Sequence, residues 1–167
     1  EEVKMVTGFR FLSLRPMLYV LNLGDDEAPH LDSAVQRHGL EKLAGRPQSA
    51  MIAICGRIEA ELSELEDAAA AELLAAYGLK EPGLHRLIRA TYDLLGLISF
   101  FTAGEPEVRA WTIRRGTNAV KAAGAIHTDI EPGFIRAEVV RCEDLLAAGR
   151  IPAAREKAQV RLEGKEY

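Results

Sequence analysis

The chain has few of the features that mark several protein classes. It holds two cysteines, Cys55 and Cys142, in 167 residues. Two cysteines outside CxxC spacing exclude a disulfide framework and disfavour a zinc site. No apolar run approaches the roughly 18 residues of a membrane helix, and the start, Glu-Glu-Val-Lys, is no signal peptide. We therefore expect a cytoplasmic protein with no membrane partner and no metal site.

Excess positive charge is also lacking. The chain carries 21 basic and 25 acidic side chains, for a net charge of −4. A protein that binds nucleic acid over its whole surface is normally basic. The charge therefore disfavours unspecific nucleic-acid binding, and we expect no DNA specificity, although a local basic face stays open.

No phosphate-binding loop occurs anywhere in the sequence. The pattern GxxxxGKS/T is absent, and no strand ends in a DxxG motif. Phosphoryl transfer needs the backbone cradle, its lysine and ligands for Mg²⁺. We expect that this chain alone does not hydrolyse a nucleotide.

The first half of the chain shows an alternation of strands and helices. Uninterrupted apolar runs predict strands over 17–21 and 50–54, each buried on both faces of a parallel sheet. Apolar spacing predicts helices over 31–43 and 57–77 and a further helix from Pro82 to Gly96. This rhythm is typical of an α/β fold.

The pattern changes after Gly96. Strands are predicted over 98–102, 108–113 and 134–140, with a helix capped by Thr117. Short helices over 143–148 and 153–158 precede a last strand at 160–162. We interpret this half as a separate small α+β roll and place the boundary near 96–98.

Two loops that follow the predicted strands carry chemistry suited to a purine base. Asn22 can hydrogen-bond a ring nitrogen, and Asp25 can accept from two N–H groups of guanine. Cys55 and Gly56 end the second strand, where glycine lets backbone N–H groups approach a base. Ligands of open α/β sheets bind at these carboxyl ends. The alternative is that both segments are only turns.

The order of several motifs resembles the YchF-type, Obg-like ATPase family along nearly the whole chain. The motifs are PMLYVLN at 16–22, IEAEL at 58–62, GLHRLIRA at 83–90, FTAG at 101–104, EVRAWTI at 107–113, IHTD at 126–129, GFIRAEV at 133–139 and RLEGK at 161–165.

That resemblance implies a fold and a division into domains. Residues 1–15 would be the return from an inserted helical hairpin, and 16–96 the C-terminal portion of a P-loop NTPase domain. Residues 97–167 would form a β-grasp, ubiquitin-like TGS domain that lacks its last strands. The missing initiator Met agrees with a piece of a longer protein.

The resemblance also implies a function. The parent would be a ribosome-associated hydrolase that binds ATP or GTP with Mg²⁺, while this fragment holds no cofactor tightly. Its base-recognising residues would be Asn22, Leu23, Asp25, Cys55 and Gly56. Asp25 stands where the family usually has Glu, and Leu23 replaces the lysine of the wider GTPase pattern, so the choice between ATP and GTP stays open.

An alternative function is a non-catalytic module that binds RNA or the ribosome through the TGS domain. Cations around an aromatic ring could contact phosphates and stack on bases. The candidate residues are Arg109, Trp111, Arg114, Arg115 and Lys121. The opposing interpretation is that Trp111 belongs to the core and the cations are solvated.

Overall fold

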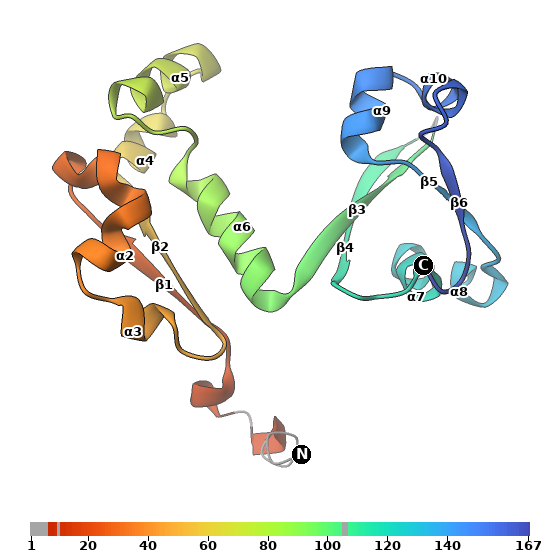
Figure 1. Cartoon of the computed structure of the whole chain (residues 1–167), viewed down its shortest axis with the longest axis horizontal. Coiled ribbons are helices and arrows are strands. Elements are labelled where there is room, and N and C mark those ends of the chain that lie inside the picture. Colours follow the sequence, from red (N-terminus) through yellow and green to blue (C-terminus); the bar gives the residue numbers. More distant parts are fainter. Residues whose placement is uncertain (1–6, 10, 105–106) are drawn as a thin grey trace. The chain divides into compact units, whose positions relative to one another are not determined.

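The computed structural model describes residues 7–9, 11–104 and 107–167 (Figure 1). The chain divides into two compact units, with the division between Gly96 and Leu97. In the described part, no helix is both long and apolar enough to cross a membrane.

Two parallel strands organise the first unit. β1 (Met17–Asn22) pairs with β2 (Ser49–Ile54) in a register that runs from Met17 opposite Ser49 to Asn22 opposite Ile54. The predicted strands and their parallel pairing are confirmed. The prediction that both faces of each strand are buried is wrong for β1, where Met17 is 47% exposed and Val20 41%. Among the described strands β1 and β2 pair only with each other, which leaves each of them with one unpaired edge.

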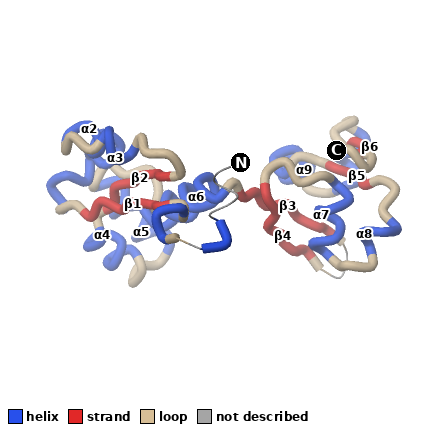
Figure 2. Tube along the Cα trace, turned by 90° about the horizontal axis from the view of Figure 1, so that it is seen from below, coloured by secondary structure: helices blue, strands red, loops and turns tan. Residues whose placement is uncertain are grey.

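Helices cover the two strands. Figure 1 shows α2 and α3 beside the strands on one side and α6 on the other, while α4 and α5 lie beyond one end of the strands; Figure 2 shows the same helices from below. The helical segments are the 3-10 turns Thr7–Phe9, Leu12–Leu14 and Asp25–Ser33, followed by α2 (Ala34–Arg37), α3 (Glu41–Ala44), α4 (Gly56–Leu62), α5 (Asp67–Ala76) and α6 (Gly83–Leu95). α6 packs against both β1 and β2.

The predicted single helix over 57–77 is wrong, because the chain breaks into α4 and α5. Ser63 ends α4, and its hydroxyl donates to the Ala60 carbonyl at 2.7 Å. Glu66 then has extended backbone angles before α5 begins. The break changes which side chains face the core, so Leu65 is 41% exposed while Leu73 packs against the core.

The predicted helix over 31–43 is also replaced by shorter pieces. The 3-10 segment runs to Ser33, and α2 ends at Arg37. Gly39 has a φ of 66°, a left-handed conformation that no α-helix continues through. The expected hairpin return over 1–15 falls partly on residues 1–6 and 10, which lie outside the described residues, and 7–9 and 12–14 form 3-10 turns.

Two small clusters of buried side chains form the core of the first unit. One buried cluster joins Ala28, Cys55, Ile58 and Leu62, with Leu73, Leu74 and Tyr77 packed against it. A second cluster joins Leu31, Ala34 and Ala53, with Leu21 and Leu23 against it. Both clusters lie beside the carboxyl ends of β1 and β2, so the loops that follow these strands rest on packed side chains.

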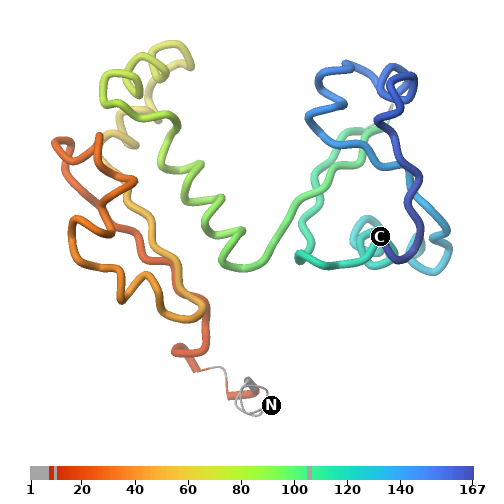
Figure 3. The backbone as a smooth tube through the Cα atoms, viewed as in Figure 1, coloured from red at the N-terminus to blue at the C-terminus, as the bar shows by residue number. Residues whose placement is uncertain are grey.

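In the part that the structure describes, the second unit contains two separate two-stranded sheets. Figure 3 traces its backbone from green to blue. β3 (Leu97–Ala103) and β4 (Val108–Arg114) form an antiparallel hairpin, and β5 (Ala137–Val139) pairs antiparallel with β6 (Arg161–Glu163). The helices between them are α7 (Ala119–Ile126), α8 (Ile130–Gly133), α9 (Cys142–Ala148) and α10 (Ile151–Glu156).

Two predictions for the second unit need correction. Asn118, not Thr117, caps the helix, since the Asn118 Oδ1 atom accepts from the Lys121 N–H at 3.0 Å. The strand expected over 134–140 shrinks to β5, because its partner β6 offers only three residues for pairing.

Candidate functional site

The two candidate base-recognising loops lie side by side. They leave neighbouring parallel strands at the same end of the sheet, where Asn22 is opposite Ile54. The Leu23 N–H donates to the Ile54 carbonyl at 2.9 Å and extends the strand pairing by one step. The loop after β1 and the loop before α4 therefore begin next to each other, at the position where open α/β sheets bind ligands.

A hydrogen bond ties the two loops together. The Gly56 backbone N–H donates to Asn22 Oδ1 at 2.9 Å. Because the amide oxygen of Asn22 is used in this bond, its Nδ2 group is the end that can donate to a purine N7. A Cβ atom on residue 56 would stand 3.0 Å from Asn22 Oδ1, so glycine permits this close approach.

Asp25 lies within the same cluster and contacts the facing loop with both carboxylate oxygens. The Cys55 thiol donates to Asp25 Oδ1 at 3.1 Å, and Arg57 Nη1 lies 3.2 Å from Asp25 Oδ2. Burial raises the pKa of the Cys55 thiol, and the Asp25 carboxylate beside it adds to the rise. The thiol is therefore a proton donor that holds Asp25 in place.

Leu23 has a different position from the other predicted residues. Its side chain is half-buried and packs against the cluster of Leu31, Ala34 and Ala53. The structure thus brings Asn22, Asp25, Cys55 and Gly56 together through direct contacts, while Leu23 anchors their loop to the core.

Two residues that contact this region were not among the predicted base-recognising residues. Arg57 follows Gly56 directly, and this position next to the loop is the sequence feature that could have identified it. Glu59 is different: its Oε1 accepts from the Gly83 N–H at 2.7 Å and its Oε2 from the Leu84 N–H at 3.1 Å. This contact fastens the start of α6 to α4 across 24 residues, and no local pattern announces it.

The structure brings two of the predicted RNA-contacting residues into direct contact and places the other three apart from them. Arg109 lies over the Trp111 ring, 4.4 Å from its centroid, and Trp111 Nε1 donates to Thr102 Oγ1 at 2.9 Å. Arg114 is three positions beyond Trp111 on β4, so strand alternation places it on the opposite face. Lys121, on α7, forms an ion pair with Glu131. Arg115 follows β4 in a turn.

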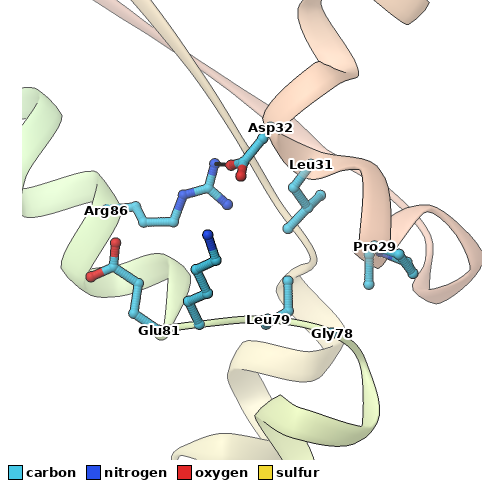
Figure 4. Close-up of a pocket in the computed structure, with 9 residues that line it drawn as sticks. Pro29, Leu31, Asp32, Gly78, Leu79, Glu81 and Arg86 are labelled. Carbon is cyan, nitrogen blue, oxygen red and sulfur yellow. Dashed lines mark hydrogen bonds and ion pairs between the residues drawn. The ribbon is translucent and has the colours of Figure 1, made fainter.

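A small cavity of about 100 Å³ lies elsewhere in the first unit (Figure 4). Arg86 donates across it to Asp32 Oδ1 at 3.1 Å. The residues that line it are Ala28, Pro29, Leu31, Asp32, Gly78, Leu79, Lys80, Glu81 and Arg86. Ligand pockets usually measure roughly 300–1,000 Å³, so this cavity is too small for a nucleotide.

The fit of these residues to a nucleotide is confined to the base. The paired loops offer an amide, a carboxylate and backbone N–H groups, whereas the sequence has no glycine-rich phosphate loop. Across the described ranges, no three His, Cys, Asp or Glu side chains gather closely enough to hold a metal ion. The described part of this cluster therefore offers hydrogen-bonding groups, without a phosphate loop beside them.

Comparison with known proteins gives consistent matches. Residues 97–167 match the family YchF-GTPase_C, described as "Protein of unknown function (DUF933)". The whole chain is 45% identical to the "Ribosome-binding ATPase YchF" of Bacillus subtilis (strain 168), covering 46% of that protein. It is 41% identical to the protein of the same name from Escherichia coli O157:H7, covering 45% of it.

A solved structure agrees with these relatives. The Schizosaccharomyces pombe YchF GTPase superimposes with a TM-score of 0.79 at 29% identity, over 99% of this chain and 44% of that one. The chain thus spans about half the length of the curated relatives that it matches. The chain therefore belongs to the YchF family and corresponds to a C-terminal part of that family's proteins.

Proposed function

We propose that residues 16–96 form the base-recognising end of a nucleotide-binding domain in a ribosome-associated ATP/GTP-binding nucleoside triphosphatase. The observation that carries the proposal is the 2.9 Å hydrogen bond from Gly56 to Asn22, which joins two loops at the carboxyl ends of paired parallel strands. In this role Asn22 Nδ2 donates to the purine N7, and the loop of Cys55 and Gly56 closes over the base edge.

Catalysis belongs, in this proposal, to a phosphate-binding loop and Mg²⁺ ligands that lie outside this chain. Mg²⁺ would neutralise phosphate charge in the parent. The relatives named "Ribosome-binding ATPase YchF" support a nucleotide and a ribosome as partners. Residues 97–167 would be the TGS, β-grasp module of the same protein.

The test is the effect of Asn22→Ala on nucleotide affinity in the full-length protein that carries this segment. Loss of a hydrogen bond to the base should weaken binding of both ATP and GTP by about tenfold or less, since such a bond contributes roughly 0.5–1.5 kcal/mol. Ser99→Ala, on β3 of the other unit, is the control. Unchanged affinity for both nucleotides in the Asn22 variant would refute the assignment.

The chain by itself gives a second test. Without a phosphate cradle, most of the binding energy for a nucleoside triphosphate is missing, so we expect no more than weak binding of ATP or GTP. Isothermal titration calorimetry with the 167-residue chain checks this. A micromolar dissociation constant would contradict this expectation, because residues of this chain that the proposal does not name would then bind the phosphates.

We propose ribosomal RNA contact through the second unit as a further function. The contact between Arg109 and Trp111 supports it, because a cation stacked on an indole suits both phosphate contact and base stacking. This function is compatible with base recognition in the first unit, and it requires no nucleotide to be bound.

A further inference from the structure

Both oxygens of the Asp25 carboxylate are engaged by groups that follow β2, one just after the strand and one in the first turn of α4. Oδ1 accepts from the Cys55 thiol at 3.1 Å, and Oδ2 lies 3.2 Å from Arg57 Nη1. These contacts come from 30 and 32 residues further along the chain, so the carboxylate is held by the fold and not by its own turn. Asp25 is therefore positioned before any ligand arrives.

Holding the carboxylate in this way has a chemical consequence. A carboxylate that reads guanine must present two acceptor oxygens to the N1–H and the exocyclic amino group of the base. Adenine has no such pair of donors on that edge, since its N1 is an acceptor. An ionised carboxylate has about four acceptor positions, so a guanine ligand must share the oxygens of Asp25 with Cys55 and Arg57 and use the lone pairs that they leave, whereas adenine need not.

The two competing groups differ in how easily they release Asp25. Cys55 is 1% exposed and belongs to the core cluster with Ile58, so its thiol stays beside Oδ1. The Arg57 side chain is 75% exposed, and that of Asp25 is 29% exposed. Arg57 Nε also lies 3.5 Å from Glu61 Oε1, one turn along α4, so Arg57 can pair with a second carboxylate when it leaves Asp25.

We propose that Arg57 is a positioning residue that sets base selectivity by engaging Asp25 and so weakening recognition of guanine relative to adenine. This inference rests on the proposed function of the Asn22 and Gly56 loops. Arg57 acts through Asp25 and needs no contact with the base itself, and Cys55 fixes the carboxylate in the orientation that Arg57 meets.

The test compares dissociation constants for ATP and GTP in the full-length protein that carries this segment. Arg57→Ala should raise the affinity for GTP relative to ATP by about two- to fivefold, as expected from the strength of an exposed ion pair. Arg57→Lys keeps the charge and should retain most of the original ratio. Arg89→Ala is the control. Arg89 lies on α6, its guanidinium pairs with Glu81 at 2.8 Å, and its loss should leave the GTP-to-ATP ratio unchanged.

The outcomes separate this inference from the proposed function. An unchanged GTP-to-ATP ratio in Arg57→Ala, or a shift towards ATP, overturns the role of Arg57 while nucleotide binding itself persists. If Asn22→Ala leaves both affinities unchanged, the base site itself is refuted. If Arg57→Lys shifts the ratio as far as Arg57→Ala does, the effect depends on the shape of the guanidinium and not on its charge alone. That result would still support the engagement of Asp25 by Arg57.

Discussion

The carboxylate of Glu59 caps helix α6 from outside that helix, with Oε1 2.7 Å from the Gly83 nitrogen. Pro82, the residue before α6, has no side-chain acceptor for the free N–H groups of the first turn. Glu59 supplies both acceptors, since its second oxygen takes the Leu84 N–H. The negative charge also lies at the favourable end of the helix dipole.

Removing this carboxylate should destabilise the first unit. Glu59→Ala leaves the part-buried Gly83 N–H without a partner and the exposed Leu84 N–H to water, and we expect a loss of about 1–3 kcal/mol in the free energy of unfolding. Glu59→Gln keeps one good acceptor and should lose less. Urea denaturation followed by circular dichroism measures the loss, and amide hydrogen exchange at Gly83 and Leu84 should accelerate.

The matched control for this prediction is Glu72→Ala, because Glu72 is an exposed glutamate of α5. It should change the unfolding free energy by less than about 0.5 kcal/mol. Equal losses for the Glu59 and Glu72 variants would show that the cap contributes nothing specific.

Gly83 should tolerate no side chain, although glycine is a poor helix former. A Cβ atom there would lie 2.8 Å from Glu59 Oε1 and 2.9 Å from Ile54 Cγ2. Gly83→Ala gains up to about 1 kcal/mol in helix propensity but must push two packed groups apart, which costs about 1–3 kcal/mol. We expect net destabilisation, measured by thermal unfolding.

Gly133→Ala serves as the comparison, since no atom lies within 4 Å of the Cβ position at Gly133. That variant should be neutral or slightly stabilising. A rise in melting temperature for Gly83→Ala would contradict the close packing of α4, α6 and β2.

The sequence was informative where the physical signal is local. Continuous apolar runs predicted β1 and β2, and their parallel pairing brought Asn22 and Gly56 together as the topology requires. The break between α4 and α5 was missed because Leu65 continued the apolar spacing although it is exposed. The Glu59–Gly83 and Arg57–Asp25 contacts were missed because they depend on the packing of distant segments.

The buried thiol of Cys55 predicts a dependence of stability on alkaline pH. Burial, with Asp25 beside it, raises the pKa of Cys55 above its ordinary value of 9.0. The folded chain therefore keeps this proton at a pH where the unfolded chain has released it. The stabilisation is complete below about 9 and is lost as the pH rises through the folded pKa.

Urea denaturation between pH 8 and pH 11 checks this dependence. Cys55→Ala should lose less stability over this range than the original chain, because it has no thiol to deprotonate. Cys142→Ala removes the exposed thiol of the chain and should keep the original slope. Parallel slopes for all three proteins would exclude a contribution from Cys55.

The Arg109–Trp111 contact predicts salt-sensitive binding to ribosomes through the second unit. Phosphate contacts weaken as salt rises, and a base stacked on an aromatic ring contributes about 1–3 kcal/mol by alanine substitution. Trp111→Ala should therefore reduce co-sedimentation of the chain with ribosomes at low salt. Trp111→Phe, which keeps a ring without the bond to Thr102, should reduce it less.

Phe101→Ala is the control for this experiment. Phe101 is opposite Ala110 in the β3–β4 hairpin and is 57% exposed, whereas Trp111 is opposite Phe100, so alternation puts Phe101 and Trp111 on different faces. Binding that falls equally in both variants would point to general loss of the hairpin. Ribosome binding that ignores both salt and Trp111 would place the contact away from this face, because neither phosphate pairing nor stacking would then hold the complex.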